Sequence, residues 1–183
     1  GFAASPRACA ETIRLASEIG LVGGSIEDAT GDPGEPIYAF GHAVERVAAA
    51  CEEARRHPFM LTARAEGFLH GRPDLDDIIR RLQAFEAAGA DVLYAPGLPS
   101  LDAIRTVCAA VSRPLNVVMG LSGPAYTVEE LAEAGVKRIS VGGSFARTSL
   151  GALVRAAREV KERGTFTYAA DAIPYAEVSA YMV

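Results

Sequence analysis

Apolar and polar positions follow two patterns that alternate along the chain. In one pattern, apolar residues recur every three or four positions, as on the buried face of a helix. It predicts helices over Ser5–Ile19, Ala43–Arg56, Leu75–Ala88, Leu101–Val111, Val128–Ala134 and Phe145–Glu162, with a short helix near Tyr175–Tyr181. The other pattern, a short apolar run bounded by Gly or Pro, is typical of strands buried on both faces. It predicts strands over Leu21–Glu27, Phe59–Arg64, Asp91–Ala95, Leu115–Met119 and Arg138–Val141.

Capping residues mark the limits of several predicted helices. Ser5 precedes Pro6 at the start of the first helix, and Asp74, Ser100 and Thr127 precede later ones. Small polar side chains at such positions accept hydrogen bonds from the free backbone N–H groups of the first turn. Glycine follows several of the same helices, where the backbone commonly turns left-handed.

Strict alternation of helix and strand predicts an α/β fold of right-handed βαβ units with a parallel sheet. Five strands are too few for a closed (β/α)₈ barrel, which takes about 250 residues. The chain has 183 residues. We therefore expect a single domain, residues 1–183, that is either an open sheet or a barrel without its first strands, followed by a helical tail.

The composition of the chain argues against some classes of binding partner. The chain is 50% hydrophobic and has a net charge of −5, so no basic surface argues for nucleic acid. No apolar run approaches the ~20 residues of a membrane helix, and no signal peptide is visible. Three widely spaced cysteines, Cys9, Cys51 and Cys108, form no CxxC pair and are expected to pack as small apolar groups. These features favour a cytoplasmic protein that binds a small molecule.

Two acids end the first predicted strand. Glu27 and Asp28 follow the apolar run directly, and in α/β folds ligands bind at the carboxyl ends of parallel strands. Successive residues of a strand point to opposite faces, so one acid is expected to face the site and the other the following loop. We expect Glu27, with Asp28 as the alternative, to bind Mg²⁺ or Mn²⁺, since these hard cations prefer oxygen ligands. A helix cap or a surface salt bridge is the structural alternative.

Two further positions could hold an anion. Arg64 ends the second predicted strand, next to Glu27 in a parallel sheet, and its guanidinium can bind a carboxylate through two hydrogen bonds. An ion pair with a nearby acid is the alternative. Gly142, Gly143 and Ser144 open the long helix that follows the fifth strand, where backbone N–H groups can bind an anionic substrate group. Such glycine pairs also occur in tight turns that bind nothing.

The segment Ala29–Gly41 follows the acid pair and contains five Gly and Pro residues, as expected for a lid over a site. His42, at the end of this segment, is a candidate general acid or base, although loop histidines are more often simply solvated. His57 and His70 are interpreted as loop residues. The strand residues Tyr94, Asn116 and Met119 are expected to fill the core.

Five segments together resemble the isocitrate lyase/phosphoenolpyruvate mutase superfamily. They occur in the family's order along nearly the whole chain, and Ala172–Glu177 is similar to the family's closing segment. The five segments are Ser25–Gly31, Leu61–Phe68, Ala88–Gly97, Pro114–Val117 and Val136–Gly143.

The resemblance implies a (β/α)₈ barrel, often tetrameric, whose last helix is exchanged between neighbours. It implies Mg²⁺ and an enolate of a 2-oxo acid formed as a C–C or P–C bond is made or broken. Glu27 matches the metal-site glutamate after the fourth strand, and Arg64 matches the arginine that holds the substrate carboxylate. The first three strands and further metal ligands would then precede Gly1, with Gly1-Phe2 ending a glycine-aromatic turn.

Two departures from the family pattern bear on the reaction. The segment Tyr38–Ala43 lacks the Lys-Lys-Cys-Gly-His run of isocitrate and methylisocitrate lyases, and also the Lys and Asn-Ser pattern of the phosphonate mutases. Pro96 stands where those mutases have a histidine. The expected function is a Mg²⁺-dependent lyase of small 2-oxo or 2-hydroxy dicarboxylates, similar to oxaloacetate decarboxylases and acyl lyases. The alternatives are P–C chemistry on phosphonopyruvate-like substrates and a non-catalytic barrel that binds 2-oxo acids.

Overall fold

The computed structural model describes residues 3–120 and 123–182 of the chain. It divides into two compact units, Gly1–Ser140 and Val141–Val183. The first unit holds the sheet and the helices between its strands, and the second holds the C-terminal helices. The expected turn at Gly1-Phe2 lies outside the described residues.

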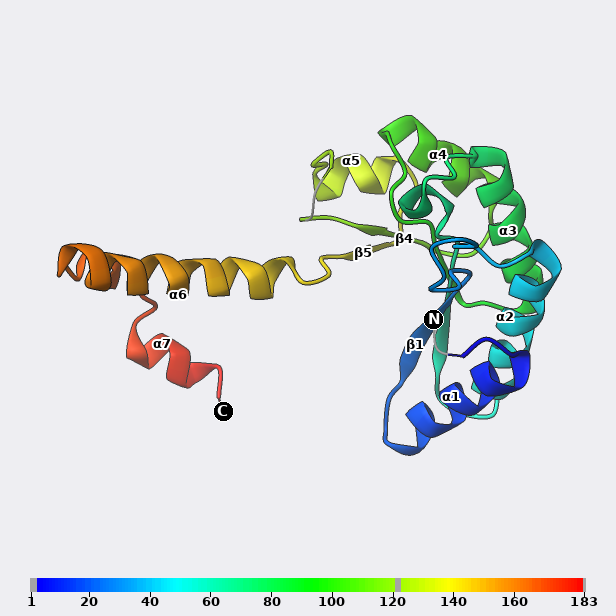
Figure 1. The fold of residues 1–183 in the computed structure, drawn as a ribbon, viewed down its shortest axis with the longest axis horizontal. Coiled ribbons are helices and arrows are strands. Elements are labelled where there is room, and N and C mark those ends of the chain that lie inside the picture. Colours follow the sequence, from blue (N-terminus) through cyan, green and yellow to red (C-terminus); the bar gives the residue numbers. More distant parts are fainter. Residues whose placement is uncertain (1–2, 121–122, 183) are drawn as a thin grey trace. The chain divides into compact units, whose positions relative to one another are not determined.

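The first unit is built on a five-stranded parallel sheet whose strands follow one another in chain order (Figure 1). Each strand pairs in parallel with the strands that precede and follow it. The strands are β1 Gly23–Glu27, β2 Met60–Arg64, β3 Val92–Tyr94, β4 Leu115–Val118 and β5 Arg138–Ser140. All five fall within the predicted runs, which confirms the α/β fold with a parallel sheet.

Helices cover one face of this sheet (Figure 1). They are α1 Pro6–Glu18, α2 Phe40–Ala54, α3 Leu75–Ala88, α4 Leu101–Ala110 and α5 Val128–Glu133, with a 3-10 helix η1 Gly67–His70 after β2. Each α-helix corresponds to a predicted one. The 3-10 helix contains His70, which was interpreted as a loop residue.

The predicted caps hold these helices in place. The side chains of Ser5, Asp74 and Ser100 each accept a hydrogen bond from the backbone N–H three residues further on. Thr127 and Glu130 form a reciprocal capping box at the start of α5. Replacing such a cap by Ala costs about 1 kcal/mol of stability. The four capping residues therefore stabilise the helices whose starts they predict.

Helix α2 begins three residues earlier than predicted, at Phe40 instead of Ala43. The N–H of Ala43 donates to the carbonyl of Ala39 at 3.0 Å, which closes the first turn. The guanidinium of Arg80 on α3 lies 4.3 Å from the centre of the Phe40 ring, so this turn is packed against its neighbour. The prediction of His42 at the end of the loop was therefore wrong, because His42 lies in the first turn of α2.

The core lies between the sheet and the helices. Strand residues with side chains on the helix-facing side alternate with residues on the opposite side, as a pleated strand requires. On the helix side, the buried strand residues are Ile26, Leu61, Ala63, Leu93, Leu115 and Val117, and their main helical partners are Val47, Ile78, Leu82, Phe85, Ile104 and Leu131.

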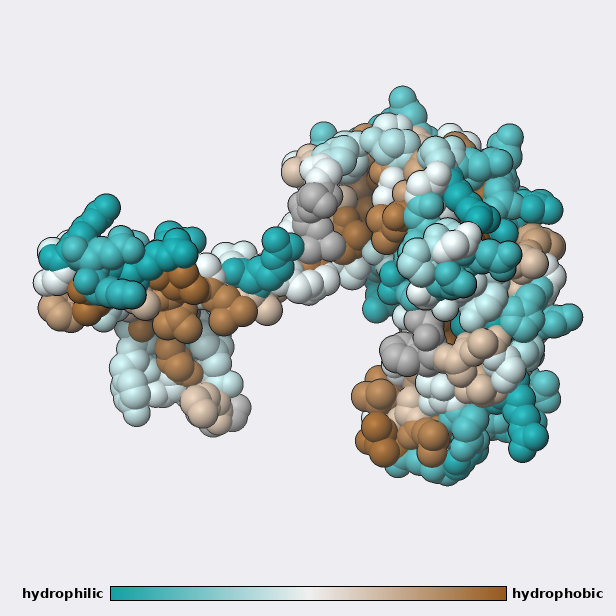
Figure 2. Space-filling model, viewed as in Figure 1, coloured by the Kyte–Doolittle hydropathy of each residue, from teal (hydrophilic) through white to brown (hydrophobic). Residues whose placement is uncertain are grey.

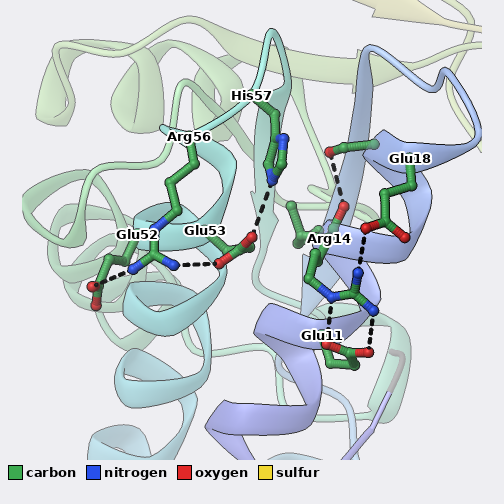
Figure 3. Close-up of polar contacts among 9 residues, drawn as sticks. Glu11, Arg14, Glu18, Glu52, Glu53, Arg56 and His57 are labelled. Atoms are coloured by element: carbon green, nitrogen blue, oxygen red, sulfur yellow. Dashed lines mark hydrogen bonds and ion pairs between the residues drawn. The ribbon is translucent and has the colours of Figure 1, made fainter.

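The outer faces of α1 and α2 carry networks of ion pairs (Figure 3). The pairs join Arg14 to Glu11 and Glu18, Arg56 to Glu52 and Glu53, and His57 to Glu53. Most of these side chains are exposed, and solvent screens exposed pairs of this kind. They therefore belong to the solvated surface and add little to stability.

None of the three cysteines forms a disulfide among the described residues, and they pack as small apolar groups, as predicted. Cys9 and Cys51 are buried in the core, and Cys108 is partly buried against it. Burial raises the pKa of the Cys51 thiol to about 11. Because the thiolate is the reactive form, Cys51 is an inert packing group at neutral pH.

The second unit consists of α6 Ser144–Arg163, the 3-10 helix η2 Thr167–Asp171 and α7 Tyr175–Ala180. The carboxylate of Glu159 ties the chain after α6 back to the helix, since it accepts hydrogen bonds from the Thr165 and Thr167 hydroxyls and from two backbone N–H groups. Both α-helices were predicted, and η2 was not.

Apolar side chains lie exposed on both units, as the brown areas of Figure 2 show. One patch on the first unit follows the α1–β1 connection, with Ile19, Leu21, Val22 and Met60. The exposed apolar residues of the second unit include Phe145, Leu150, Leu153, Phe166, Ile173 and Tyr175. Within the described part of the chain, no helix combines the length and apolar character needed to cross a membrane.

Candidate active site

A row of polar side chains crosses the sheet on the face opposite the helices. The register places Glu27 beside Arg64, Arg64 beside Tyr94, Tyr94 beside Asn116 and Asn116 beside Arg138. Side chains of register partners project to the same face of a sheet. The row begins at the last residue of β1 and ends at the first residue of β5, so it follows the stagger that strands adopt in barrels.

A cavity of about 490 Å³ lies against this face. Four members of the row line it, namely Arg64, Tyr94, Asn116 and Arg138. Hydroxyl groups add to its polar wall, from Ser25, Thr62 and Ser140. Tyr94 and Asn116, which the strand pattern predicts in the core, both face this cavity instead. The core on the helix side is filled by the alternate positions of each strand.

Arg64 sits between two carboxylates. Its Nε donates to Glu66 Oε1 at 2.7 Å, and its Nη2 lies 3.6 Å from Glu27 Oε2. The guanidinium also stacks 4.9 Å from the centre of the Tyr94 ring. Burial alone would lower the pKa of Arg64, but the hydrogen bond with Glu66 and the charges of both acids raise it. Arg64 is therefore a fixed cation at the wall of the cavity.

Glu66 is a member of this site that the sequence analysis missed. The residue is 3% exposed, and its carboxylate makes the shorter of the two contacts to Arg64. The available signal was its position two residues after Arg64, in the first residues beyond the strand. An acid so close to a strand-end arginine can hold the guanidinium in one orientation, because an ionised carboxylate accepts from its N–H groups.

Asp28 points away from Glu27, as strand alternation requires. Its carboxylate is buried and accepts from the Glu66 N–H at 2.8 Å through Oδ1 and from Arg81 Nη1 at 3.2 Å through Oδ2. Burial raises the pKa of Asp28, and the backbone hydrogen bond from Glu66 and the charge of Arg81 act against the rise. The two oxygens of Asp28 thus connect the end of β1 with the segment after β2 and with α3.

A buried arginine fixes the backbone at Glu27. Arg46 of α2 donates from Nη1 to the Glu27 carbonyl at 2.7 Å and from Nη2 to the Ala3 carbonyl at 3.0 Å. Its guanidinium also stacks 4.2 Å from the centre of the Tyr38 ring. Because Arg46 is almost fully buried, these contacts hold the strand end and the segment before α1 together.

The predicted lid is closed at its base by backbone hydrogen bonds. The Tyr38 N–H donates to the Asp28 carbonyl at 2.8 Å, and the Thr30 N–H donates to the Pro36 carbonyl at 2.9 Å. The tip of the segment, residues 31–35, is exposed. His42 lies beyond it, and its Nε2 is 2.8 Å from the Ala4 carbonyl. The residues that line the cavity do not include His42.

Glu27 is the one acid of the row that could bind a cation. Among the described residues, no three His, Cys, Asp or Glu side chains are grouped as a metal site. Mg²⁺ retains several waters and often takes only one or two carboxylates. The chemistry of Glu27 therefore fits one position in a Mg²⁺ shell, and the other described residues do not supply the rest.

The glycine turn proposed for anion binding belongs to the second unit. Gly142 has a φ of 51°, a left-handed conformation that favours glycine. Gly143 caps α6 without a side chain, and the Ser144 N–H donates to the Val141 carbonyl. A role of Gly142, Gly143 and Ser144 in substrate binding stays a prediction.

Comparison with known proteins decides the family. The model of the phosphoenolpyruvate phosphomutase family matches residues 1–161. The chain belongs to this family. It is thereby a member of the isocitrate lyase/phosphoenolpyruvate mutase superfamily, which confirms the resemblance found in the sequence.

Individual members of the superfamily agree with this assignment. The chain is 29% identical to 2-methylisocitrate lyase of Escherichia coli K12 over 144 residues, covering 74% of the chain and 48% of the relative. It is 31% identical to oxaloacetate decarboxylase of Paraburkholderia xenovorans over 152 residues, covering 78% and 48%. The chain spans about half the length of the curated relatives it matches.

A solved structure gives the same picture of the fold. A crystal structure from Burkholderia cenocepacia J2315, classed as a lyase/mutase, is 55% identical and superimposes with a TM-score of 0.95. It covers 100% of this chain, which in turn covers 66% of that one. The five parallel strands and their helices thus form the α/β arrangement of the superfamily's barrel.

Proposed function

We propose that the chain carries part of the active site of a lyase that cleaves a C–C bond of a small 2-oxo or 2-hydroxy dicarboxylate through an enolate. The observation that carries this proposal is the pair Glu27 and Arg64, register partners at the carboxyl ends of β1 and β2 with 3.6 Å between their charged groups. The names of two relatives, a 2-methylisocitrate lyase and an oxaloacetate decarboxylase, support the reaction class.

Arg64 would bind the substrate carboxylate. Glu66 engages its Nε, and the Tyr94 ring lies against the guanidinium plane, so the remaining N–H groups keep a constant direction. A substrate held in this way would present the bond to be broken in one orientation, which lowers the entropic part of the barrier.

Glu27 would supply one oxygen ligand to Mg²⁺ or Mn²⁺. When bound there, the metal would act as a Lewis acid for the charge that develops on the enolate oxygen. The contact between Glu27 and Arg64 would keep the acid ionised and oriented towards the substrate. We assign no proton transfer to His42, since its Nε2 lies within hydrogen-bond distance of a backbone carbonyl.

The test is an assay of the full-length protein with oxaloacetate and with 2-methylisocitrate, at saturating Mg²⁺ and with the metal removed by EDTA. The proposal predicts that, with Mg²⁺, the protein consumes substrate faster than the same solution without protein, and that EDTA abolishes this excess rate. From oxaloacetate, pyruvate with CO₂ would identify a decarboxylase, and oxalate with acetate would identify an acyl lyase. From 2-methylisocitrate, pyruvate with succinate would identify a lyase of that substrate. Binding of 2-oxo acids without turnover would identify the non-catalytic alternative, and turnover of phosphonopyruvate in ³¹P NMR would identify P–C chemistry.

The proposal includes a homo-oligomer, a tetramer, and a cytoplasmic location. The exposed apolar side chains on α6 and after it support association, since contiguous apolar surface commonly marks an interface. Light scattering coupled to size-exclusion chromatography measures the mass directly. A monomer at micromolar concentration would rule out the tetramer and would leave the chemistry of Glu27 and Arg64 untouched.

A further inference from the structure

The cavity contains a second guanidinium besides that of Arg64. Arg138, the first residue of β5, extends along the cavity wall until its Nη1 donates to Thr62 Oγ1 at 3.1 Å. Thr62 lies two positions before Arg64 on the same face of β2, a spacing of about 6.6 Å along a strand. The Arg138 guanidinium thus contacts β2 at Thr62, the residue that precedes Arg64 on the same face of the strand.

The two arginines differ in their charge balance. Arg64 lies between Glu66 and Glu27, whereas Arg138 has no carboxylate within ion-pair distance among the described residues. Its described polar partner is the neutral hydroxyl of Thr62. The described residues that line the cavity include no Asp or Glu. The positive charge of Arg138 is therefore not neutralised from within this part of the protein, and the cavity favours an anion.

Asn116 adds an unsatisfied acceptor between the two cations. It is 3% exposed and lies between Tyr94 and Arg138 in the row. Its Nδ2 donates to Ser140 Oγ at 3.1 Å, and its Oδ1 is the one buried side-chain polar atom without a partner among the described residues. An unpaired buried acceptor destabilises a protein, so its retention on a cavity wall fits a hydrogen bond donated by a ligand.

We propose that Arg138 and Asn116 form a second substrate subsite, in which Arg138 binds a distal anionic group and Asn116 accepts a hydrogen bond from a hydroxyl. The inference rests on the proposed function, because it takes Arg64 as the anchor of the first carboxylate. The ligand class that matches two cations with an acceptor between them is a four- or five-carbon 2-hydroxy dicarboxylate. Arg138 is then the residue that distinguishes dicarboxylates from monocarboxylates.

The test compares three simple probes by calorimetry on the full-length protein with Mg²⁺ saturating. Malate has both carboxylates and the hydroxyl, lactate lacks the distal carboxylate, and succinate lacks the hydroxyl. The parent protein should bind malate most tightly. Arg138→Gln should weaken malate binding ~10- to 100-fold, the loss of a charge-assisted hydrogen bond, and should change lactate binding less than twofold.

Two further variants separate the possible failures. Arg138→Lys retains the charge and should recover part of the malate affinity, whereas a purely structural role would not follow the charge in this way. Equal losses for malate and lactate in Arg138→Gln, or no loss for either, would overturn the subsite. If Arg64→Lys weakens both ligands while Arg138→Gln weakens neither, the proposed function stands without the subsite. If the parent binds none of the probes, the proposed function fails as well.

Discussion

Asp28 and Arg81 lie 53 positions apart in the chain and form an ion pair of 3.2 Å whose side chains are 0% and 8% exposed. The same Arg81 nitrogen also donates to the Tyr38 carbonyl at 3.1 Å. Because Asp28 accepts the N–H of Glu66 as well, the pair joins helix α3 to the base of the loop after β1 and to the residue that orients Arg64.

Removing one partner of this pair should destabilise the protein strongly. Arg81→Met leaves the Asp28 carboxylate buried without its cation, and breaking a buried pair in this way costs about 3–5 kcal/mol. Urea unfolding at pH 7 measures the change. The matched control is Arg80→Met, whose exposed side chain pairs with Asp77 on the surface and should cost about 1 kcal/mol or less. Similar losses in the two variants would mean that Asp28 does not depend on Arg81.

Asp77 should make stability depend on pH in acid solution. Burial alone would raise the pKa of Asp77, but hydrogen bonds from Arg80 and Arg81 lower it below its usual value. A carboxyl whose folded pKa is lowered stabilises the fold above its unfolded pKa of about 3.9, and that contribution disappears as the pH falls through the lower value. The parent and Asp77→Asn should therefore differ most in urea midpoint at pH 6 and converge towards pH 2. A difference that is constant with pH would contradict the assignment.

Glu27 should contribute to divalent metal affinity. Glu27→Gln keeps the size of the side chain but removes the charge that a hard cation prefers. Titration of the full-length protein with Mn²⁺, followed by electron paramagnetic resonance, should show weaker binding in the variant. Glu45→Gln, at an exposed position on α2, is the control and should bind as the parent does. Unchanged affinity in Glu27→Gln would remove Glu27 from the metal site.

Arg64→Lys should weaken the binding of 2-oxo acids while the protein remains folded. Lysine keeps the charge but cannot present the planar pair of N–H groups that matches a carboxylate. The expected loss is roughly ten- to a hundred-fold in affinity for oxalate, measured by calorimetry with Mg²⁺ saturating. Arg105→Lys on the exposed face of α4 controls for the substitution itself. If oxalate binds equally to both variants, Arg64 serves only as the ion-pair partner of Glu66.

The loop after β1 should become more protected when ligand binds. Its base is hydrogen-bonded through Tyr38 and Thr30, whereas its tip, residues 31–35, is exposed. Hydrogen exchange with and without oxalate plus Mg²⁺ should show added protection in residues 31–35 and little change at Tyr38. Equal exchange at the tip in both states would remove the lid from the mechanism.

The fold, and the adjacency of Glu27 and Arg64 in the candidate site, could be predicted from the sequence. Apolar runs and caps located the strands and helices, and parallel order predicted that Glu27 would lie beside Arg64, which the register confirms. The remaining row was not predictable in the same way. Whether Asn116 and Arg138 face the cavity depends on a stagger between strands that accumulates across the sheet, and no single segment encodes it.

Glu66 and α2 illustrate two other reasons for incomplete prediction. Glu66 lies in an irregular segment where side-chain direction follows from tertiary contacts, here with Arg64 and Asp28. Helix α2 begins at Phe40, earlier than predicted, and the Phe40 ring packs against Arg80 of a different helix, α3. Tertiary contacts of this kind override local patterns, so they become visible only when the elements are assembled.

The consecutive strand order has a consequence for how the first unit is synthesised. Each of the strands β2 to β5 pairs with the strand made just before it, so none of these four pairings waits for a distant segment of the chain to leave the ribosome. From β1 onwards the sheet can grow by one crossover at a time, with short loop closures at every step. The same order leaves one edge of the newest strand unpaired until the next helix and strand have been synthesised. A pause in translation would therefore expose that edge to a second nascent chain, and mispairing between copies is the error that this topology invites.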